Sequence, residues 1–401
     1  MTTKLNTLLS CGLLTLFTLN TAQAQAQAKE FTFNHSAKVG IGYNSNIYRT
    51  HDGTYTDWAD NATPIVNPNV QSGFFIPLQY SLGGSYGLND KTTLLGGANI
   101  KEKLYLGSDL TNANESKYKL DFGAIHTLAG KKRRVSTIHG NLFIDSVDKT
   151  YYDRDTGLEK IAGVTDVADR YSYRGHGVQL TYKNRTDQTF KYGGGLTLGS
   201  RDYTDTIANS QMDYDYTILE ADIDYQLQKA TALSAGIKNE VQDYDERPSR
   251  NLAGSLFLSN PVLEYTYLTL SFGVKHRLND NWVLHGDYKN IERDDSWVNY
   301  NGYTAHKFKL RAIHKRDNTR TKLSLSTQTR DYPNALAFDD PVNGVNINKT
   351  YDTFGWSLSR EIEQTQHRSL WGKIAYHNTD TNDLRYNYDR FIVSAGYQWK
   401  Y

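Results

Sequence analysis

The amino-acid sequence predicts an all-β protein, a transmembrane antiparallel up-and-down β-barrel of about 16 strands, in a range of about 16–18. Three observations lead to this fold class. Segments of roughly ten residues with alternating apolar and polar side chains recur along the chain, as in transmembrane strands. Short polar turns alternate with much longer connections. Tyr occurs 30 times and Gly 31 times, which suits strands with aromatic side chains at a membrane interface.

The overall composition argues against several other classes of protein. Only 38% of the 401 residues are hydrophobic, and the mean hydropathy is −0.64. Beyond the N-terminus, no segment approaches the ~18 apolar residues of a transmembrane helix. Lys and Arg together number 45, and Asp and Glu number 44. This balance gives no indication of a nucleic-acid partner, so any charge asymmetry that guides a ligand has to be local.

The N-terminal segment 1–28 predicts a secretory signal peptide. Lys4 supplies its positive charge and 5–19 its apolar core, and the following NTAQAQAQAKE offers small-x-small cleavage sites. Cleavage is expected after Ala24, Ala26 or Ala28. It would remove Cys11, the single cysteine, which excludes a disulfide framework or a cysteine metal site in the mature chain. No linker or composition shift follows, so we expect 29–401 to form one barrel domain.

Six segments show the strand pattern clearly. In each, apolar residues recur at every second position, so one face is apolar and the other is small, polar or charged. They are AKVGIGY (37–43), IPLQYSLGGSYGL (76–88), TFKYGGGLTLG (189–199), YLTLSFGVKHRL (267–278), NWVLHGDYKN (281–290) and HKFKLRAIHK (306–315).

The connections between the expected strands sort by length. Short turns are expected at 88–92, 129–134, 183–188, 228–231, 278–281, 315–320 and 363–368. Long connections are expected at 44–72, 147–170, 245–261 and 331–349. Outer-membrane barrels have short periplasmic turns and long external loops, so this alternation favours a barrel over a soluble propeller or sandwich.

The C-terminal segment RFIVSAGYQWKY predicts the strand that closes the barrel against the first strand. A closed sheet is required because every backbone amide in lipid must be paired. The alternation places Ser394, Gly396, Gln398 and Lys400 toward the lumen. A final strand ending on an aromatic residue also resembles the signal read by the barrel-insertion machinery of Gram-negative bacteria. The residues that carry this resemblance are Phe391, Val393, Tyr397, Trp399 and Tyr401.

A short motif recurs where strands are expected to emerge into long loops: SRDYTD (200–205), VQDYDE (241–246), ERDDS (292–296) and TRDYPN (329–334). The simplest interpretation is a membrane-interface girdle, with Tyr at the interface and the charges in water. The alternative is a ligand-binding repeat.

No constellation of residues predicts an enzyme or a cofactor. The glycines at 193–195 lie in a strand pattern without a following helix, so they do not predict a phosphate loop. The 11 histidines show no helical metal-binding spacing. Loop acids such as Asp153, Asp155, Asp339 and Asp340 suit solvated charge better than a calcium site. A Ser–His pair assembled across strands, as in an outer-membrane hydrolase, stays open as an alternative.

Charged residues gather on the faces expected to line the lumen. The inward basic residues, interpreted as electrostatic guides, are Lys238, Lys275, Lys289, Arg293, Lys307, Lys309, Arg311 and Arg330. Glu220, Asp222 and Asp224 are expected to form an opposing acidic wall, which would create a transverse field. A basic stripe alone would favour anionic solutes, and cross-strand pairing of these charges is the simpler alternative. Inward aromatic candidates are Phe75, Tyr105, Phe143 and Tyr267.

The segments GYNSNIYRTHDG (42–53) and YYDRDTG (151–157) resemble the outer-membrane β-barrel porins associated with bacterial exopolysaccharide gene clusters. Members typically begin with a glycine-rich strand ending near Tyr-Asp-Ser-Asn, and here Asn44 stands in place of the Asp. The resemblance covers nearly the whole expected barrel. It implies a barrel of about sixteen to eighteen strands that acts as a conduit for a secreted polysaccharide.

The sequence and the resemblance together predict a channel in the outer membrane of a Gram-negative bacterium, with export of an extracellular polysaccharide as its specific role. The expected partners are outer-membrane lipid and lipopolysaccharide, the barrel-insertion machinery and periplasmic components of polysaccharide export. Three alternatives stay open: a general or anion-selective diffusion porin, a barrel enzyme, and a surface scaffold that acts through its loops.

Overall fold

The computed structural model describes residues 31–56, 65–131, 134–162, 165–186, 189–204, 212–337 and 347–401. The expected signal peptide, 1–28, and the loop acids Asp339 and Asp340 lie outside these ranges. Within them, the chain forms no helix that is both long and apolar enough to cross a membrane.

The described chain is almost entirely β-structure. Its long strands are β1 (Phe31–Asn44), β4 (Gly73–Asn89), β5 (Thr92–Tyr105), β6 (Glu115–Lys131), β7 (Arg134–Lys149), β10 (Tyr173–Arg185), β11 (Phe190–Tyr203), β12 (Tyr214–Gln228), β13 (Thr231–Pro248), β14 (Val262–Arg277), β15 (Trp282–Asp295), β16 (Tyr303–Arg316), β17 (Thr319–Leu336), β18 (Asn348–Thr365), β19 (Arg368–Thr381) and β20 (Tyr388–Lys400). Short elements lie in the connections: the hairpins β2 (Tyr55–Thr56) with β3 (Ile65–Val66) and β8 (Ile161–Ala162) with β9 (Thr165–Asp166), and the 3₁₀ helices η1 (Ser108–Ala113) and η2 (Leu384–Tyr386).

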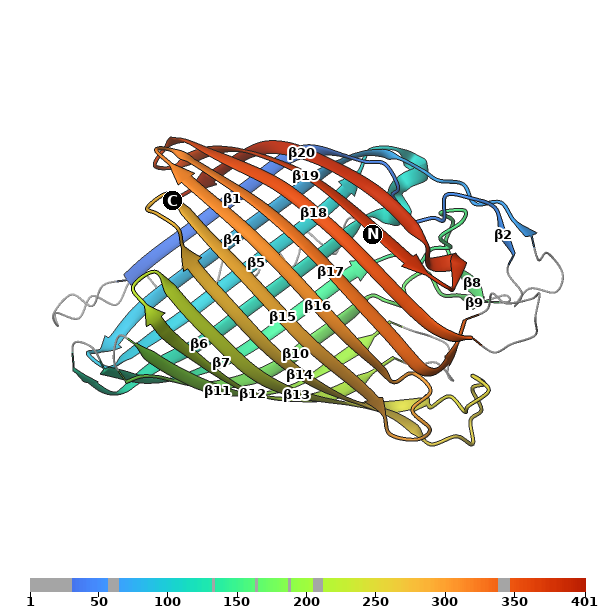
Figure 1. Cartoon of the computed structure of the whole chain (residues 1–401), viewed down its shortest axis with the longest axis horizontal. Helices are drawn as coiled ribbons and strands as arrows, with labels where there is room; N and C mark the ends of the chain where they lie inside the picture. The colour runs from blue at the N-terminus through green and yellow to red at the C-terminus, as the bar shows by residue number, and fades with distance from the viewer. Residues whose placement is uncertain are drawn as a thin grey trace, which may run out of the picture.

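The 16 long strands close into one antiparallel barrel (Figure 1). Neighbours in the sheet follow chain order, and β20 pairs with β1 to complete the circle. Closure pairs the backbone groups that an open sheet would leave at its edges, which a hydrocarbon environment does not tolerate. The predicted fold class, strand number and pairing of the first and last strands are therefore confirmed.

The two ends of the barrel differ, as the connection lengths predicted. All seven predicted short turns join consecutive strands at one end, where the C-terminus also lies (Figure 1). The long connections and the hairpins β2–β3 and β8–β9 lie at the other end. We call these the turn end and the loop end.

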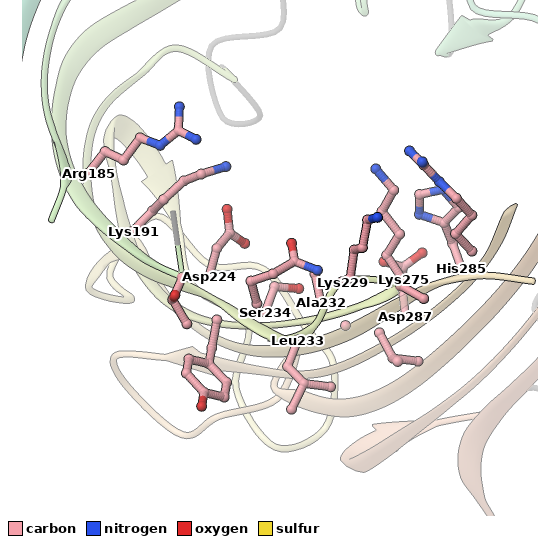
Figure 2. A pocket seen from close by; sticks show the side chains of 17 residues that line it. Arg185, Lys191, Asp224, Lys229, Ala232, Leu233, Ser234, Lys275, His285 and Asp287 are labelled. Carbon is pink, nitrogen blue, oxygen red and sulfur yellow. The ribbon is translucent and has the colours of Figure 1, made fainter. Parts of the chain in front are cut away.

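Alternation divides each strand into an outer and an inner face. Large apolar side chains on the outer face are exposed, for example Leu120, Phe122, Leu142 and Ile144 on β6 and β7. A barrel with this outer surface suits lipid rather than water. The same division is visible on β13, where Leu233 points away from the lumen (Figure 2). The strand registers carry the inner and outer assignments around the whole sheet.

Glycines allow close packing where the barrel closes. Gly40 of β1 pairs with Gly396 of β20, and both lie on the inner face. A Cβ on Gly40 would overlap the backbone oxygen of Ala395 and the ring of Trp371, which crosses this seam from β19. Lys38 lies over the same ring, with its Nζ 4.0 Å from the ring centroid. The seam therefore needs a small residue at position 40 so that Trp371 can cover the pairing of first and last strands.

Candidate functional site

The predicted basic residues all lie on the inner face and form a continuous wall across β13 to β17. Cross-strand registers place Lys289 on β15 beside Lys307 on β16, whereas Lys309 pairs with the acid Asp287. We call this surface the basic wall. It consists of Lys238, Lys275, Lys289, Arg293, Lys307, Lys309, Arg311 and Arg330.

Ion pairing accounts for only part of the basic wall. Lys238 binds Glu240 at 2.6 Å, and Arg311 binds Asp287 at 2.7 Å. Among the described residues, Lys289, Lys307 and Lys309 form no ion pair. Like charges this close raise the local positive potential, which mobile anions in the lumen would lower.

The predicted acidic residues do not oppose the basic wall. Glu220, Asp222 and Asp224 face the lumen from β12, but β12 adjoins β13, so the carboxylates lie beside the basic wall. The sequence shows which strands are acidic, but the position across the lumen depends on the strand count and closure. The idea of two opposed walls is therefore wrong in its geometry.

The wall across the lumen is also basic, which the sequence analysis missed. Half the circuit away from β16 lie β5 and β6. Their inward positions include Lys101 paired with Lys117, and Asn99 paired with Lys119. The acids on this side are Asp121, Glu115, which binds Lys117 at 3.0 Å, and Asp145 of β7, which pairs in register with Lys119. Following the alternation of inward and outward residues through 99–121 would have placed these lysines on the inner face. Cations thus face cations across the lumen.

The recurring Arg/Asp–Tyr motif also lies differently from the girdle interpretation. In SRDYTD, Arg201 and Tyr203 are two residues apart and therefore share the inner face, while Asp202 points outward. Tyr244 and Tyr332 likewise lie on the inner face, with the acids Asp243 and Asp331 outside. The girdle prediction is wrong because it treated the tyrosines as membrane-facing without following the alternation through to the loop end.

These tyrosines join others in a band around the inside of the loop end, which we call the tyrosine belt. It consists of Tyr173, Tyr203, Tyr214, Tyr244, Tyr265, Tyr303, Tyr332, Tyr351 and Tyr386. Rings touch within two runs, from Tyr173 to Tyr265 and from Tyr303 to Tyr386. Centroids are 5.2 Å apart for Tyr173–Tyr203 and for Tyr214–Tyr244, and 5.4 Å apart for Tyr303–Tyr332. Such spacings are typical of favourable aromatic pairs.

Arginines lie among the rings of the belt. Arg293 bridges Tyr265 and Tyr303, with its guanidinium carbon 4.5 Å and 4.4 Å from the two ring centroids. Arg201 stacks on Tyr173 at 4.8 Å, and Arg330 stacks on Tyr303 at 4.7 Å. A stacked guanidinium is held flat and keeps donors available at its edge. Tyr214 and Tyr265 are buried, whereas the other seven rings are partly exposed. The partly exposed rings therefore offer apolar faces beside charged hydrogen-bond donors.

Two long loops pack against the opposite part of the same opening. Ile47 and Tyr48 of the first loop, with Leu110 of η1, pack on the inward rings of Phe75 and Tyr105. This confirms the predicted inward placement of those two rings. The pKa of Tyr48 is raised to about 12, mainly because the phenol is buried. The first loop is thus folded onto the inner wall.

The connection between β7 and β10, described over 150–162 and 165–172, spans part of the opening, and we call it the crossing loop. Its Arg154 lies over Tyr386 at 4.7 Å, although β7 and η2 are far apart around the barrel. The Thr50 hydroxyl donates to the Arg154 carbonyl at 2.5 Å, and the Tyr55 hydroxyl donates to Asp155 Oδ2 at 2.8 Å. The crossing loop therefore joins two sides of the loop end.

A salt bridge holds the turn of the crossing loop. Lys160 Nζ lies 2.7 Å from Asp153 Oδ2, and the other Asp153 oxygen accepts from the backbone amides of Asp155 and Thr156. Burial raises the pKa of Asp153, but the bond and charge of Lys160 and these amides outweigh it, so the pKa lies below 3.8. Gly157 has φ +74° and packs against the Tyr48 ring, where a Cβ would clash. Asp153, which was expected to be a solvated charge, thus forms an ion pair with Lys160.

No protein-family model matches the sequence, and no curated protein matches it. Solved structures do share the fold. Salmonella typhi OmpF, in a complex with daunomycin, aligns over 95% of this chain and 100% of its own with a TM-score of 0.51 and 13% identity. The outer-membrane channel DcaP of Acinetobacter baumannii aligns over 95% and 100% with a TM-score of 0.50 and 12% identity. An anion-selective porin from Comamonas acidovorans aligns over 93% and 100% with a TM-score of 0.49 and 10% identity.

The chain thus has the fold of outer-membrane porins and channels, a closed 16-strand barrel. At these identities the likeness concerns the fold alone. Its lumen combines the basic wall, the tyrosine belt and the crossing loop, and function has to be argued from these features.

Proposed function

We propose that the chain is an outer-membrane channel that conducts an anionic extracellular polysaccharide out of the cell. The observation that carries this proposal is the coexistence of the basic wall and the tyrosine belt in one lumen. The belt lies at the loop end, which in an outer-membrane barrel faces outward, and the basic wall extends from it toward the turn end. A chain leaving the cell would pass the basic wall first and the belt last.

The two surfaces suit two features of an acidic glycan. A basic lumen concentrates anions and lowers the electrostatic barrier to a polyanion. The flat, amphipathic faces of tyrosine suit the C–H faces of sugar rings, and their hydroxyls and the stacked guanidiniums supply hydrogen bonds. Many weak contacts spread along a wall favour conduction over tight binding, because cargo must also leave.

An anion-selective diffusion porin is the second candidate, and the basic residues on both walls favour it. Small anions need the positive potential but no aromatic platform. The two functions therefore differ in what they require from the tyrosine belt.

The proposed partners follow from the ends and faces of the barrel. Periplasmic components of polysaccharide export would meet the turn end, and outer-membrane lipid and lipopolysaccharide would surround the apolar outer face. Phe391, Val393, Tyr397 and Trp399 alternate on the outer face of β20, and Tyr401 directly follows the strand, as a signal for the barrel-insertion machinery would require.

A liposome assay with a double variant separates the two candidate functions. Wild-type protein and the variant Tyr303→Ala/Tyr332→Ala, which removes two partly exposed neighbouring rings of the belt, are reconstituted, and efflux of chloride and of fluorescent polygalacturonate is measured. The proposal expects wild type to release both and the variant to lose most glycan efflux while keeping chloride efflux. Tyr192→Ala, on the outer face, is the matched control. Chloride efflux without glycan efflux in wild type would establish the diffusion porin instead, and no efflux of either would refute conduction.

A further inference from the structure

A hollow on the inner wall at the turn end lies apart from the tyrosine belt. It has a volume of about 390 Å³ and is formed by the turn-end parts of β10 to β15 (Figure 2). We call it the turn-end pocket. The charged residues that line it and enter the argument are Lys191, Asp224, Lys275 and Asp287.

The cations of the pocket are not neutralised by the acids beside them. Lys191 pairs in register with Asp224, and Lys275 with His285, yet among the described residues Lys191, Lys275 and Asp224 form no ion pair. Figure 2 shows Lys191 and Lys275 extending into the lumen from opposite sides of the hollow, with Asp224 and Asp287 closer to the wall. Asp287 is held in place by Arg311 at 2.7 Å.

The floor of the pocket is made of small residues. Ser234 on β13 pairs with Gly273 on β14 between the charged groups, so no bulky side chain fills the space. A second hollow of about 200 Å³ shares Asp224, Ser234, Gly273 and Asp287 with the first and continues to Lys289. Because Lys289 belongs to the basic wall, the pocket opens onto the proposed conduction path.

This arrangement suits a ligand with two kinds of polar group. Ammonium groups bind a carboxylate, while the carboxylates of Asp224 and Asp287 accept hydrogen bonds from hydroxyl groups and repel a simple anion. A sugar acid carries both groups on one ring, and the hollow is roomy enough for such a ring. A bare phosphate uses only the cations, and a neutral sugar uses only the acids.

We propose that the turn-end pocket is a loading site that binds an acidic sugar residue of a glycan entering from the periplasm. This inference rests on the proposed function for the direction of transport, and it names acidic sugars as the substrate class. Binding would hold the leading part of the glycan beside the second hollow, which continues to Lys289.

Calorimetric titration of the full-length barrel in detergent tests the binding site without requiring conduction. The probes are hexagalacturonate, maltohexaose and inorganic phosphate. The proposal expects hexagalacturonate to bind more tightly than both other probes. Lys191→Gln/Lys275→Gln should weaken its binding about tenfold, since two partly exposed charge contacts are lost. Lys322→Gln/Lys373→Gln, which removes two lumenal cations from β17 and β19, should change it less than about twofold.

A second variant tests the shape of the site without changing its charge. Ser234→Phe fills the floor and should weaken hexagalacturonate binding while the barrel still migrates as a folded species. Equal weakening by the two double variants would overturn the pocket as a defined site. Equal affinity for phosphate and hexagalacturonate would overturn the sugar specificity. Binding that depends on the pocket in a barrel that conducts neither ions nor glycan would refute the proposed channel function and leave the binding site intact.

Discussion

Removing three cations of the basic wall should sharply reduce anion selectivity. The triple variant Lys289→Gln/Lys307→Gln/Lys309→Gln takes away adjacent positive charges that form no ion pair among the described residues. In water, one such charge attracts a monovalent anion at about 5 Å by about 0.8 kcal/mol, which ionic screening at about 0.1 M reduces to about 0.5 kcal/mol. Three charges therefore contribute about 1.5 kcal/mol, or about a tenfold difference in local anion concentration.

Reversal potentials across planar bilayers measure this effect. We expect the anion-to-cation permeability ratio of the triple variant to fall several-fold at low salt and to approach that of wild type at about 1 M salt, where the screening length is only about 3 Å. Arg316→Gln, at the exposed end of β16, is the matched control and should change little. An unchanged ratio at low salt, or a change that does not depend on salt, would refute the electrostatic account of the lumen.

Three further predictions concern the belt, the crossing loop and the seam. Arg293→Met removes a guanidinium that stacks on two rings and donates to the Asn301 carbonyl. In thermal denaturation this change should lower the unfolding free energy by about 1–3 kcal/mol. A loss equal to that of Arg316→Met would contradict this role. Folding lowers the pKa of Asp153, so its contribution to loop docking is present above the unfolded pKa of 3.8 and is lost as the pH falls through the folded pKa. Protease cleavage of the crossing loop should therefore rise only in strong acid. Asp153→Asn should remove this pH dependence, and an equal rise in that variant would count against it. Gly40→Val should disrupt the seam and reduce the yield of heat-modifiable folded barrel in gel electrophoresis. Gly372→Ala, where a Cβ meets nothing within 4 Å, should fold normally. Equal yields would show that the close approach at the seam is unimportant.

The fold could be predicted from the sequence because the pattern that indicates it is local and repeated. Alternation and connection length each depend on neighbouring residues, so the strands, the turns and the pairing of β20 with β1 could all be predicted. The same alternation predicted the inward side of the basic residues from Lys238 to Arg330. These features need no knowledge of where the strands lie around the barrel.

What the sequence could not supply was position around the circle and beyond the strand ends. Whether Asp224 faces Lys309 across the lumen or lies near it depends on strand count and closure. The tyrosine belt leaves a motif in the sequence, but the motif alone does not show its face, which follows only when the alternation is continued to Tyr203. The packing of Tyr48 against the crossing loop joins residues far apart in sequence, and no local pattern encodes it.

Single-channel recording of the wild-type protein in a planar bilayer under a potassium chloride gradient tests the central claim most directly. The account predicts an open channel whose reversal potential has the sign of chloride selectivity, because cations line both walls of the lumen. A closed barrel, or a reversal potential with the sign of potassium selectivity, would contradict it.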